Sequence, residues 1–134
     1  MAREKNLDNK VLSFLEEQNA WSIKYWAGAK YTKEGIPDIL ACINGKFFGI
    51  EDKAENGRPK MLQLKNLQWI REAGGYGILL YPKDFEMFKA FIINNKTDAA
   101  KQWYLQNIEL QKEWYNKLNK IWAYYLHYTI FSVL

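Results

Sequence analysis

The dipeptide Asn44-Gly45 constrains the fold of this chain more than any other feature of its sequence. Asn and Gly both tolerate a positive φ, and an Asn-Gly pair between two apolar runs is the strongest short-range signal for a β-hairpin. Such runs occupy residues 39–43 and 46–53 on either side of the pair. We therefore expect two strands joined by a two-residue turn, which fixes how their side chains face one another.

The pattern along the rest of the chain predicts an α/β fold. Apolar residues at helical spacing predict helices over 7–18, 60–73, 82–93 and 97–126, and strand patterns occupy 21–26 and 76–81. The resulting order, α-β-β-β-α-β-α, predicts a small mixed sheet flanked by helices within residues 1–94. Residues 95–134 then form an aromatic-rich helical extension.

The helix expected over 97–126 carries a wide apolar stripe at helical spacing. Its members are Trp103, Tyr104, Ile108, Leu110, Trp114, Tyr115, Leu118, Ile121, Trp122 and Tyr125. Such a stripe could stack on single-stranded DNA or lie on a membrane surface. Because aromatic stripes on helices more often pack, we expect this one to pack on its own core or on a second copy of the chain.

The composition excludes several classes of protein. No apolar run approaches the roughly 20 residues that span a bilayer, and the N-terminal residues lack the apolar segment of a secretion signal. The single cysteine, Cys42, forbids an internal disulfide and fits a reducing cytoplasm. Its apolar neighbours predict that it lies in the core. We expect a cytoplasmic protein with no membrane partner.

The ionisable residues restrict the available chemistry. The formal net charge of +4 suits a polyanionic partner, but the basic residues are spread out, so a nucleic-acid surface must be assembled by folding. His127 is the only histidine, so Ser-His-Asp, Cys-His and zinc sites lack their usual parts. The sequence has neither a GxxxxGK(S/T) nor a GxGxxG loop, which argues against a nucleotide cofactor. Any catalytic chemistry must therefore use carboxylates and lysines, with or without a metal ion.

Two acidic motifs meet across the expected hairpin. The sequence Gly-Ile-Pro-Asp ends at Asp38 and is followed, after twelve residues, by Glu51-Asp52-Lys53. Side chains alternate along a strand, so Glu51 and Lys53 share one face, and Asp38 lies opposite a residue near Glu51. Two carboxylates and a lysine therefore converge at one end of the sheet. Carboxylate oxygens suit a hard cation such as Mg²⁺, and a nearby lysine can orient water.

These motifs resemble the active site of the PD-(D/E)XK nuclease superfamily. More narrowly, GIPD, then NGKFFGIEDK, a Gly-containing turn and MLQ at a helix start are similar to the virus-type replication-repair nuclease (VRR-NUC) domain. The resemblance covers roughly residues 5–93. It implies a phage- or prophage-encoded enzyme that acts in the bacterial host cell, cuts branched DNA such as Holliday junctions, and works as a homodimer.

The resemblance also implies residue roles. Asp38 and Glu51 would hold Mg²⁺ or Mn²⁺, with the main-chain carbonyl of Asp52 as a further ligand. Lys53 would be the catalytic lysine, and Gln63 would fix that lysine or a phosphate oxygen.

Other expected contacts lie outside this motif. Asp8 stands where the family places a first-helix glutamate that holds the metal through water, although Glu4, Glu16 or Glu17 could be the equivalent residue. The basic residues expected to contact DNA phosphates are Lys24, Lys30, Lys33, Arg58, Lys60 and Lys65.

Asp52 departs from the family pattern, in which the residue between the glutamate and the lysine is apolar and faces the core. Its carboxylate needs a partner, an exposed edge or a shifted register. This departure favours one alternative, a degenerate nuclease fold that binds DNA or protein without cutting. Two further alternatives stay open: a nuclease directed at flaps or ends, and a purely structural module whose C-terminal helix drives association.

Overall fold

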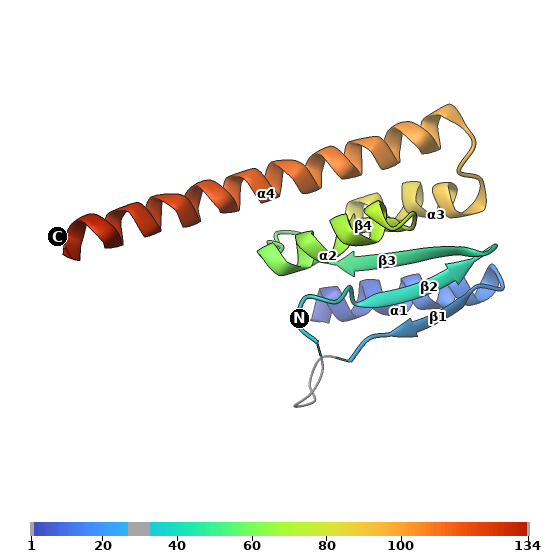
Figure 1. The fold of residues 1–134 in the computed structure, drawn as a ribbon. Helices are drawn as coiled ribbons and strands as arrows, with labels where there is room; N and C mark the ends of the chain where they lie inside the picture. Colours follow the sequence, from blue (N-terminus) through green and yellow to red (C-terminus); the bar gives the residue numbers. More distant parts are fainter. Residues whose placement is uncertain (1, 27–32, 134) are drawn as a thin grey trace.

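The structure is a computed structural model that describes the backbone of residues 2–26 and 33–133, and the side chains of 6–26 and 33–129. Its order of helices and strands is the predicted one (Figure 1). The elements are α1 (Ala2–Glu17), β1 (Trp21–Lys24), β2 (Ile39–Ile43), β3 (Lys46–Asp52), α2 (Met61–Glu72), β4 (Tyr76–Leu80), the 3₁₀ turn η1 (Pro82–Asp84), α3 (Phe85–Ile93) and α4 (Asp98–Val133).

The four strands form one mixed sheet in the order β1-β2-β3-β4, which confirms the predicted class of fold. The first three strands are antiparallel, and β4 runs parallel to β3. Asn44 and Gly45 both have positive φ, 51° and 77°, as the predicted hairpin turn requires. The register pairs Ile39 with Ile50, so one further step along both strands sets Asp38 opposite Glu51.

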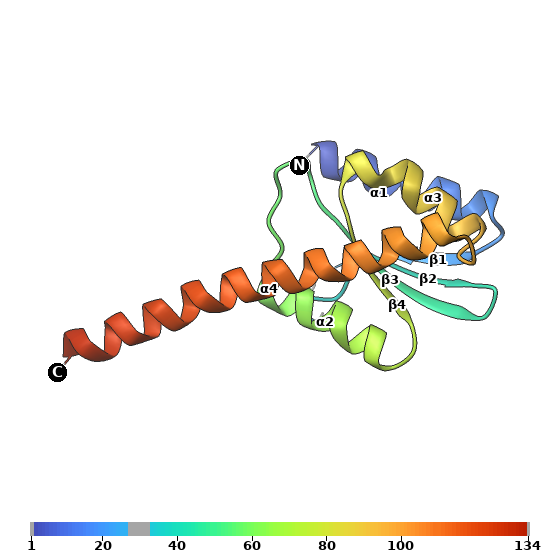
Figure 2. The same cartoon turned by 90° about the horizontal axis from the view of Figure 1, so that it is seen from above.

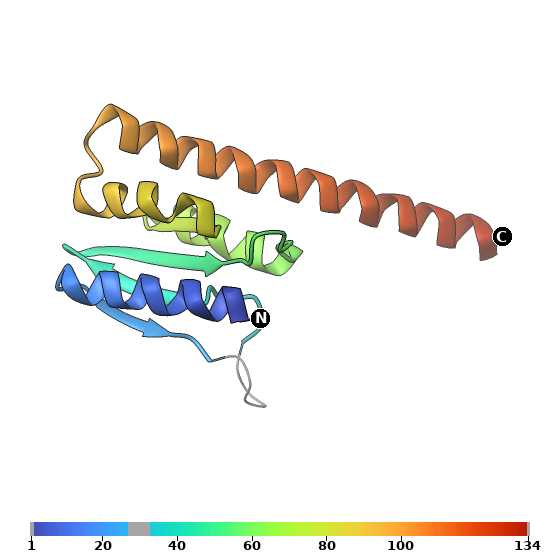
Figure 3. The same ribbon diagram turned by 180° about the vertical axis from the view of Figure 1, so that it is seen from behind.

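Helices cover the two faces of the sheet unequally. Helices α1 and α3 lie on one face, where Val11, Ile50 and Phe88 belong to the larger core cluster (Figure 3). Helix α2 lies on the other face, where Leu67 and Leu79 form a second, smaller cluster with α4. Seen from above, α4 crosses over the molecule between the helices of the two faces (Figure 2).

Cys42 is exposed, so the prediction that it lies in the core was wrong. It belongs to the face of β1 and β2 that looks toward the α2 side of the sheet. Helix α2 packs on β3 and β4 and leaves that part of the face open. Trp21 and Ile23 of β1 share the open face, and 58% and 42% of their surfaces are exposed.

Two side-chain amides of α4 pair with the outer edge of β4. Asn107 Oδ1 accepts a hydrogen bond from the Leu79 N–H at 3.0 Å, and Asn107 Nδ2 donates to the Leu79 carbonyl at 2.7 Å. Gln111 Nε2 donates to the Gly77 carbonyl at 2.8 Å. An unpaired strand edge invites association with other chains, and these amides close it.

The apolar stripe of α4 packs on the body of the protein only in its first part. Trp103 is buried, and Trp114 packs against α2 and β4. From Asn119 to Thr129 every residue is exposed, and this segment extends beyond the sheet (Figure 1). Trp122 and Tyr125, which the stripe predicted to pack, expose 57% and 64% of their surfaces in the single chain. In the described part of the protein, no helix is long and apolar enough to cross a membrane.

The edge contacts make a prediction about stability. Asn107→Leu should lower the free energy of unfolding by about 2 kcal/mol or more, because it leaves the N–H and carbonyl of Leu79 covered but unpaired. Urea denaturation followed by circular dichroism measures the change. Asn116→Leu, at an exposed position of the same helix, is the matched control and should change stability little. Equal stabilities of the two variants would contradict this role for Asn107.

Candidate active site

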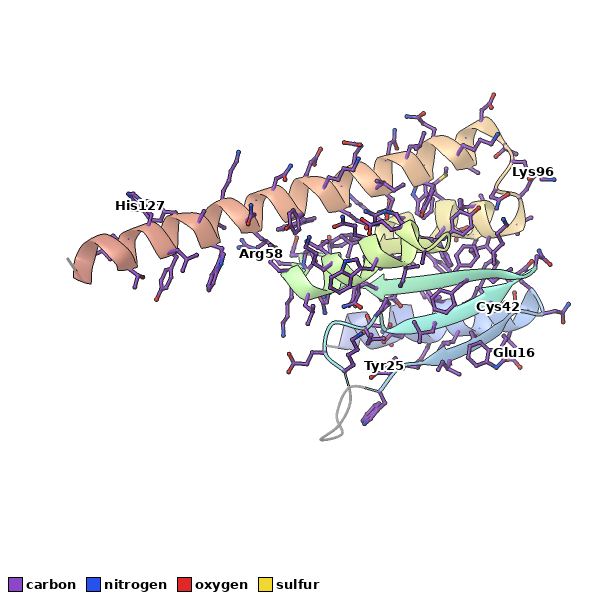
Figure 4. The ribbon with its side chains drawn as sticks, in the orientation of Figure 1. Glu16, Tyr25, Cys42, Arg58, Lys96 and His127 are labelled. Carbon is purple, nitrogen blue, oxygen red and sulfur yellow. The ribbon has the colours of Figure 1, made fainter. Side chains whose placement is uncertain are left out.

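Asp38, Glu51 and Lys53 lie at one end of the sheet, where β1 and β3 end and β2 begins (Figure 1). Figure 4 labels Tyr25 at this end, and Cys42 and Glu16 at the opposite end. Glu16 is therefore remote from the site, and both Glu16 and Glu17 are exposed. The side chain of Glu4 lies outside the described residues. Among the acidic side chains of α1 that the structure describes, Asp8 is the one that is buried against the sheet.

The Gly-Ile-Pro-Asp segment is held by close contacts with α2 and β3. Gly35 has a φ of +77°, and a Cβ there would collide with the side chain of Leu62 on α2. Pro37 is buried against Gly49, where a Cβ would meet the proline ring. These small and rigid residues fix the start of β2, and so the position of Asp38.

The carboxylate of Asp38 is oriented by the neighbouring strand. Its Oδ2 accepts a hydrogen bond from the Asp52 N–H at 2.9 Å, while its main-chain carbonyl accepts one from Tyr25 at 2.7 Å. Within a strand, the N–H and the C=O of one residue point to the same side. The main-chain carbonyl of Asp52, predicted as a metal ligand, therefore points toward Asp38.

Glu51 is a buried carboxyl group with too little positive charge around it. Only 1% of its surface is exposed, and Lys53 Nζ lies 3.4 Å from its Oε2. Its Oε1 has no hydrogen-bond partner among the described residues. Burial, with repulsion from Asp38 adding to it, raises the pKa of Glu51 to about 9, while Lys53 opposes the rise. Burial also raises the pKa of Asp38.

A divalent cation fits this pair of carboxyl groups. Asp38 and Glu51 offer hard oxygen ligands at one point, and the orphaned Oε1 of Glu51 needs a positive partner. No three His, Cys, Asp or Glu side chains converge anywhere in the described part of the chain. A cation would therefore rest on two carboxylates, completed by main-chain oxygen or water, as Mg²⁺ sites often are.

Asp8 and Lys24 lie on the other face of the sheet from Asp38 and Glu51. Asp8 Oδ2 is 3.1 Å from Lys24 Nζ, so this lysine, predicted to contact phosphate, is paired with a carboxylate. Asp52 points to the same face as Asp8 and is fully buried. Its register is not shifted, and burial, with Asp8 adding to it, raises the pKa of Asp52 well above its ordinary value.

Gln63 caps the start of α2 in this structure. Its Oε1 accepts a hydrogen bond from the Lys60 N–H at 2.8 Å, and within the described residues no hydrogen bond joins it to Lys53. Its amide therefore stabilises the helix that packs beside Asp38. Its Nε2 can donate to a phosphate oxygen, whereas a hydrogen bond from the Lys53 ammonium group would require its Oε1, which already accepts from the Lys60 N–H.

The remaining basic residues differ in their surroundings. Arg58 and Lys60 are exposed; Lys60 is the residue before α2, and Arg58 lies beside the start of this helix (Figure 4). Lys65 lies 4.6 Å from the centre of the Tyr115 ring of α4. Lys33 is exposed, and Lys30 lies outside the described residues.

One supporting residue was missed from the sequence. The Tyr81 hydroxyl donates to the Gly57 carbonyl at 2.8 Å, and the Lys53 N–H donates to Leu80 at 2.9 Å. These bonds hold the turn that follows Lys53. Tyr81 follows an apolar strand, and its sequence gave no sign of this contact.

Comparison with known proteins adds no family assignment: no model of a protein family matches the sequence, and no curated protein matches it. The geometry itself combines two carboxylates that suit a hard cation with a lysine on the same face. That combination is suited to hydrolysis of a phosphate ester.

The buried proton on Glu51 predicts how the stability of the metal-free protein depends on pH. The pKa of Glu51 is about 9 in the folded chain and has an ordinary value of 4.5, so the folded state holds more protons between these values. The free energy of unfolding should therefore fall as the pH rises from about 5 to about 9. Glu51→Gln, whose amide does not titrate, should lose much of this slope in thermal melts recorded with EDTA.

Glu109→Gln is the control for this experiment, because Glu109 lies on the exposed side of α4 and, among the described residues, forms an ion pair with Lys112 alone. It should keep the slope of the natural chain. A melting temperature of the natural chain that rises with pH over the same range would contradict an uncompensated carboxyl group at position 51.

Proposed function

We propose that this protein is a Mg²⁺- or Mn²⁺-dependent DNA endonuclease of the PD-(D/E)XK type, similar to VRR-NUC domains. Its substrate would be branched DNA such as a Holliday junction, cut during phage or prophage replication, recombination or repair in the host cytoplasm. One observation carries the proposal: Asp38, Glu51 and Lys53 lie on one face at one end of the sheet.

Asp38 and Glu51 would hold the cation, with the main-chain carbonyl of Asp52 beside them. When bound, the cation supplies positive charge that polarises the phosphate and lowers the pKa of water. Lys53 is 8% exposed, so few water molecules compete for its ammonium group. From its position 3.4 Å from Glu51, the ammonium group can orient the attacking water and screen the charge that develops on the phosphate.

Basic groups near the site support a phosphate backbone as the substrate. Arg58 and Lys60 are exposed where α2 begins, and the first turn of this helix carries no acidic residue. The free N–H groups at a helix start attract phosphate, and the basic side chains add to that attraction. The exposed part of α4 extends past the same end of the sheet (Figure 1).

A binding module without catalytic activity is the second candidate function. Two observations favour it: the amide oxygen of Gln63 is engaged in capping α2, and Glu51 is almost fully buried. A protein of this kind would bind branched DNA with equal affinity whether or not a divalent cation is present. A nuclease directed at flaps or ends would differ from the main proposal only in its substrate.

The first test of the proposal is cleavage of labelled four-way junction, flap and duplex DNA, with and without Mn²⁺. The natural chain should cut the junction, and Asp38→Asn, Glu51→Gln and Lys53→Ala should each abolish cleavage, because each removes a group at the reacting phosphate. Asp38→Asn and Glu51→Gln should also weaken Mn²⁺ binding, whereas Lys53→Ala should not. Near-normal turnover by Lys53→Ala on every substrate would refute the assigned site.

We also propose that the enzyme is a homodimer, because a four-way junction has two equivalent strands and a two-fold dimer presents one active site to each. Two apolar surfaces are open in the single chain: the sheet face with Trp21 and Ile23, and the α4 segment with Trp122 and Tyr125. Large exposed apolar surfaces commonly mark protein contacts.

Light scattering at micromolar concentration should therefore report twice the chain mass of 15.9 kDa. Replacing Trp21 and Ile23 by serine in one variant, and Trp122 and Tyr125 in another, identifies the contact surface, since only one pair of changes should yield monomers. A natural chain that is monomeric, and stays so with junction DNA bound, would contradict the dimer and favour a flap or end nuclease.

A further inference from the structure

On the α1 side of the sheet lies a second group of buried carboxyl oxygens that have no hydrogen-bond partner among the described residues. Four buried side-chain oxygens have no hydrogen-bond partner among the described residues. One is the Oε1 of Glu51, and the other three are both oxygens of Asp52 and the Oδ1 of Asp8. Asp52 is 0% exposed and Asp8 is 4% exposed, so water does not take the place of these partners at the surface. Uncompensated carboxylates are costly to bury, and these two lie together.

The packing of α1 on β3 brings the two aspartates together. Phe48 and Ile50 of β3 face α1 and belong to the same core cluster as Leu7. Asp52 is the next residue of β3 on that face, and Asp8 follows Leu7 in α1. The two carboxyl groups are close enough that Asp8 is the main contributor, after burial itself, to the raised pKa of Asp52.

Lys24 neutralises only the outer part of this pair. Its Nζ lies 3.1 Å from the Oδ2 of Asp8, and its side chain is 34% exposed. When both aspartates are ionised, one ammonium group faces two carboxylates, so one negative charge has no counterion among the described residues. The oxygens without a partner, on Asp52 and Asp8, are buried, whereas the Lys24 side chain is partly exposed.

We propose that Asp8 and Asp52 form a second divalent-cation site, separate from the Asp38–Glu51 pair and on the opposite face of β3. Its ligand would be a hard cation such as Mg²⁺ or Mn²⁺, which takes carboxylate oxygens and completes its shell with water or main-chain oxygen. Lys24, being partly exposed, would move aside to admit the ion. The bound cation ties α1 to the end of β3, which carries Glu51 and is followed by Lys53. It stabilises the fold and takes no part in cleavage, so the site does not depend on the proposed nuclease function.

The test counts Mn²⁺ ions by titration calorimetry and electron paramagnetic resonance, without any DNA. The natural chain should bind about two Mn²⁺ ions, and the double variants Asp38→Asn/Glu51→Gln and Asp8→Asn/Asp52→Asn should each bind about one. Thermal melts should show that Mn²⁺ still raises the melting temperature of the first double variant. The single variant Asp52→Asn provides a milder change if the second double variant does not fold. Glu109→Gln is the control and should bind as the natural chain does.

The outcomes separate this site from the proposed catalytic one. If Asp8→Asn/Asp52→Asn, or Asp52→Asn alone, binds as many Mn²⁺ ions as the natural chain, the second site is refuted. It is also refuted if Asp38→Asn/Glu51→Gln folds but binds no Mn²⁺, because the aspartate pair then holds a proton instead. A single ion that is lost only in the Asp8 and Asp52 variants would support this site and remove the basis of the proposed catalytic centre.

Discussion

The register of the β2–β3 hairpin is the constraint on which the candidate site depends. The Asn44-Gly45 turn pairs Ile39 with Ile50, and therefore brings Asp38 opposite Glu51. A slip by one residue would turn Glu51 toward α1 and bury a different set of side chains. The hydrogen bond from the Asp52 N–H to Asp38 then holds the open end of the hairpin in this register. Fold and site are thus specified by the same turn.

The candidate site buries ionisable groups at the end of the sheet, which is energetically unfavourable. Four carboxyl groups, at positions 8, 38, 51 and 52, share two ammonium groups, at positions 24 and 53. Neither face of β3 is neutral when all of these groups are ionised. Protons or cations must supply the difference, and a hard divalent cation does so most directly because its preferred ligands are these oxygens. The rest of the fold, with its large aromatic core, offsets the energetic cost.

Most of the fold was predictable because its signals are local. Apolar periodicity predicted the helices, and the Asn44-Gly45 turn predicted that Asp38 and Glu51 lie close together. The remaining features depend on tertiary contacts. Asn107 and Gln111 sit within an aromatic stripe, and only the position of α4 along β4 makes them partners of the strand edge. Cys42 is exposed because α2 covers one half of the sheet, which no strand pattern reveals. The pairing of Asp52 with Asp8 likewise depends on where α1 packs.

Anomalous X-ray diffraction from crystals grown with Mn²⁺ shows directly whether Asp38 and Glu51 bind a metal ion. We expect an anomalous peak bonded to the carboxylates of Asp38 and Glu51, on the α2 side of the sheet and next to Lys53. A fully ordered sheet end without manganese at that pair, in crystals soaked at saturating Mn²⁺, would contradict the assigned metal site. It would show that the buried carboxyl groups hold protons, and that the site is not built for metal-dependent chemistry.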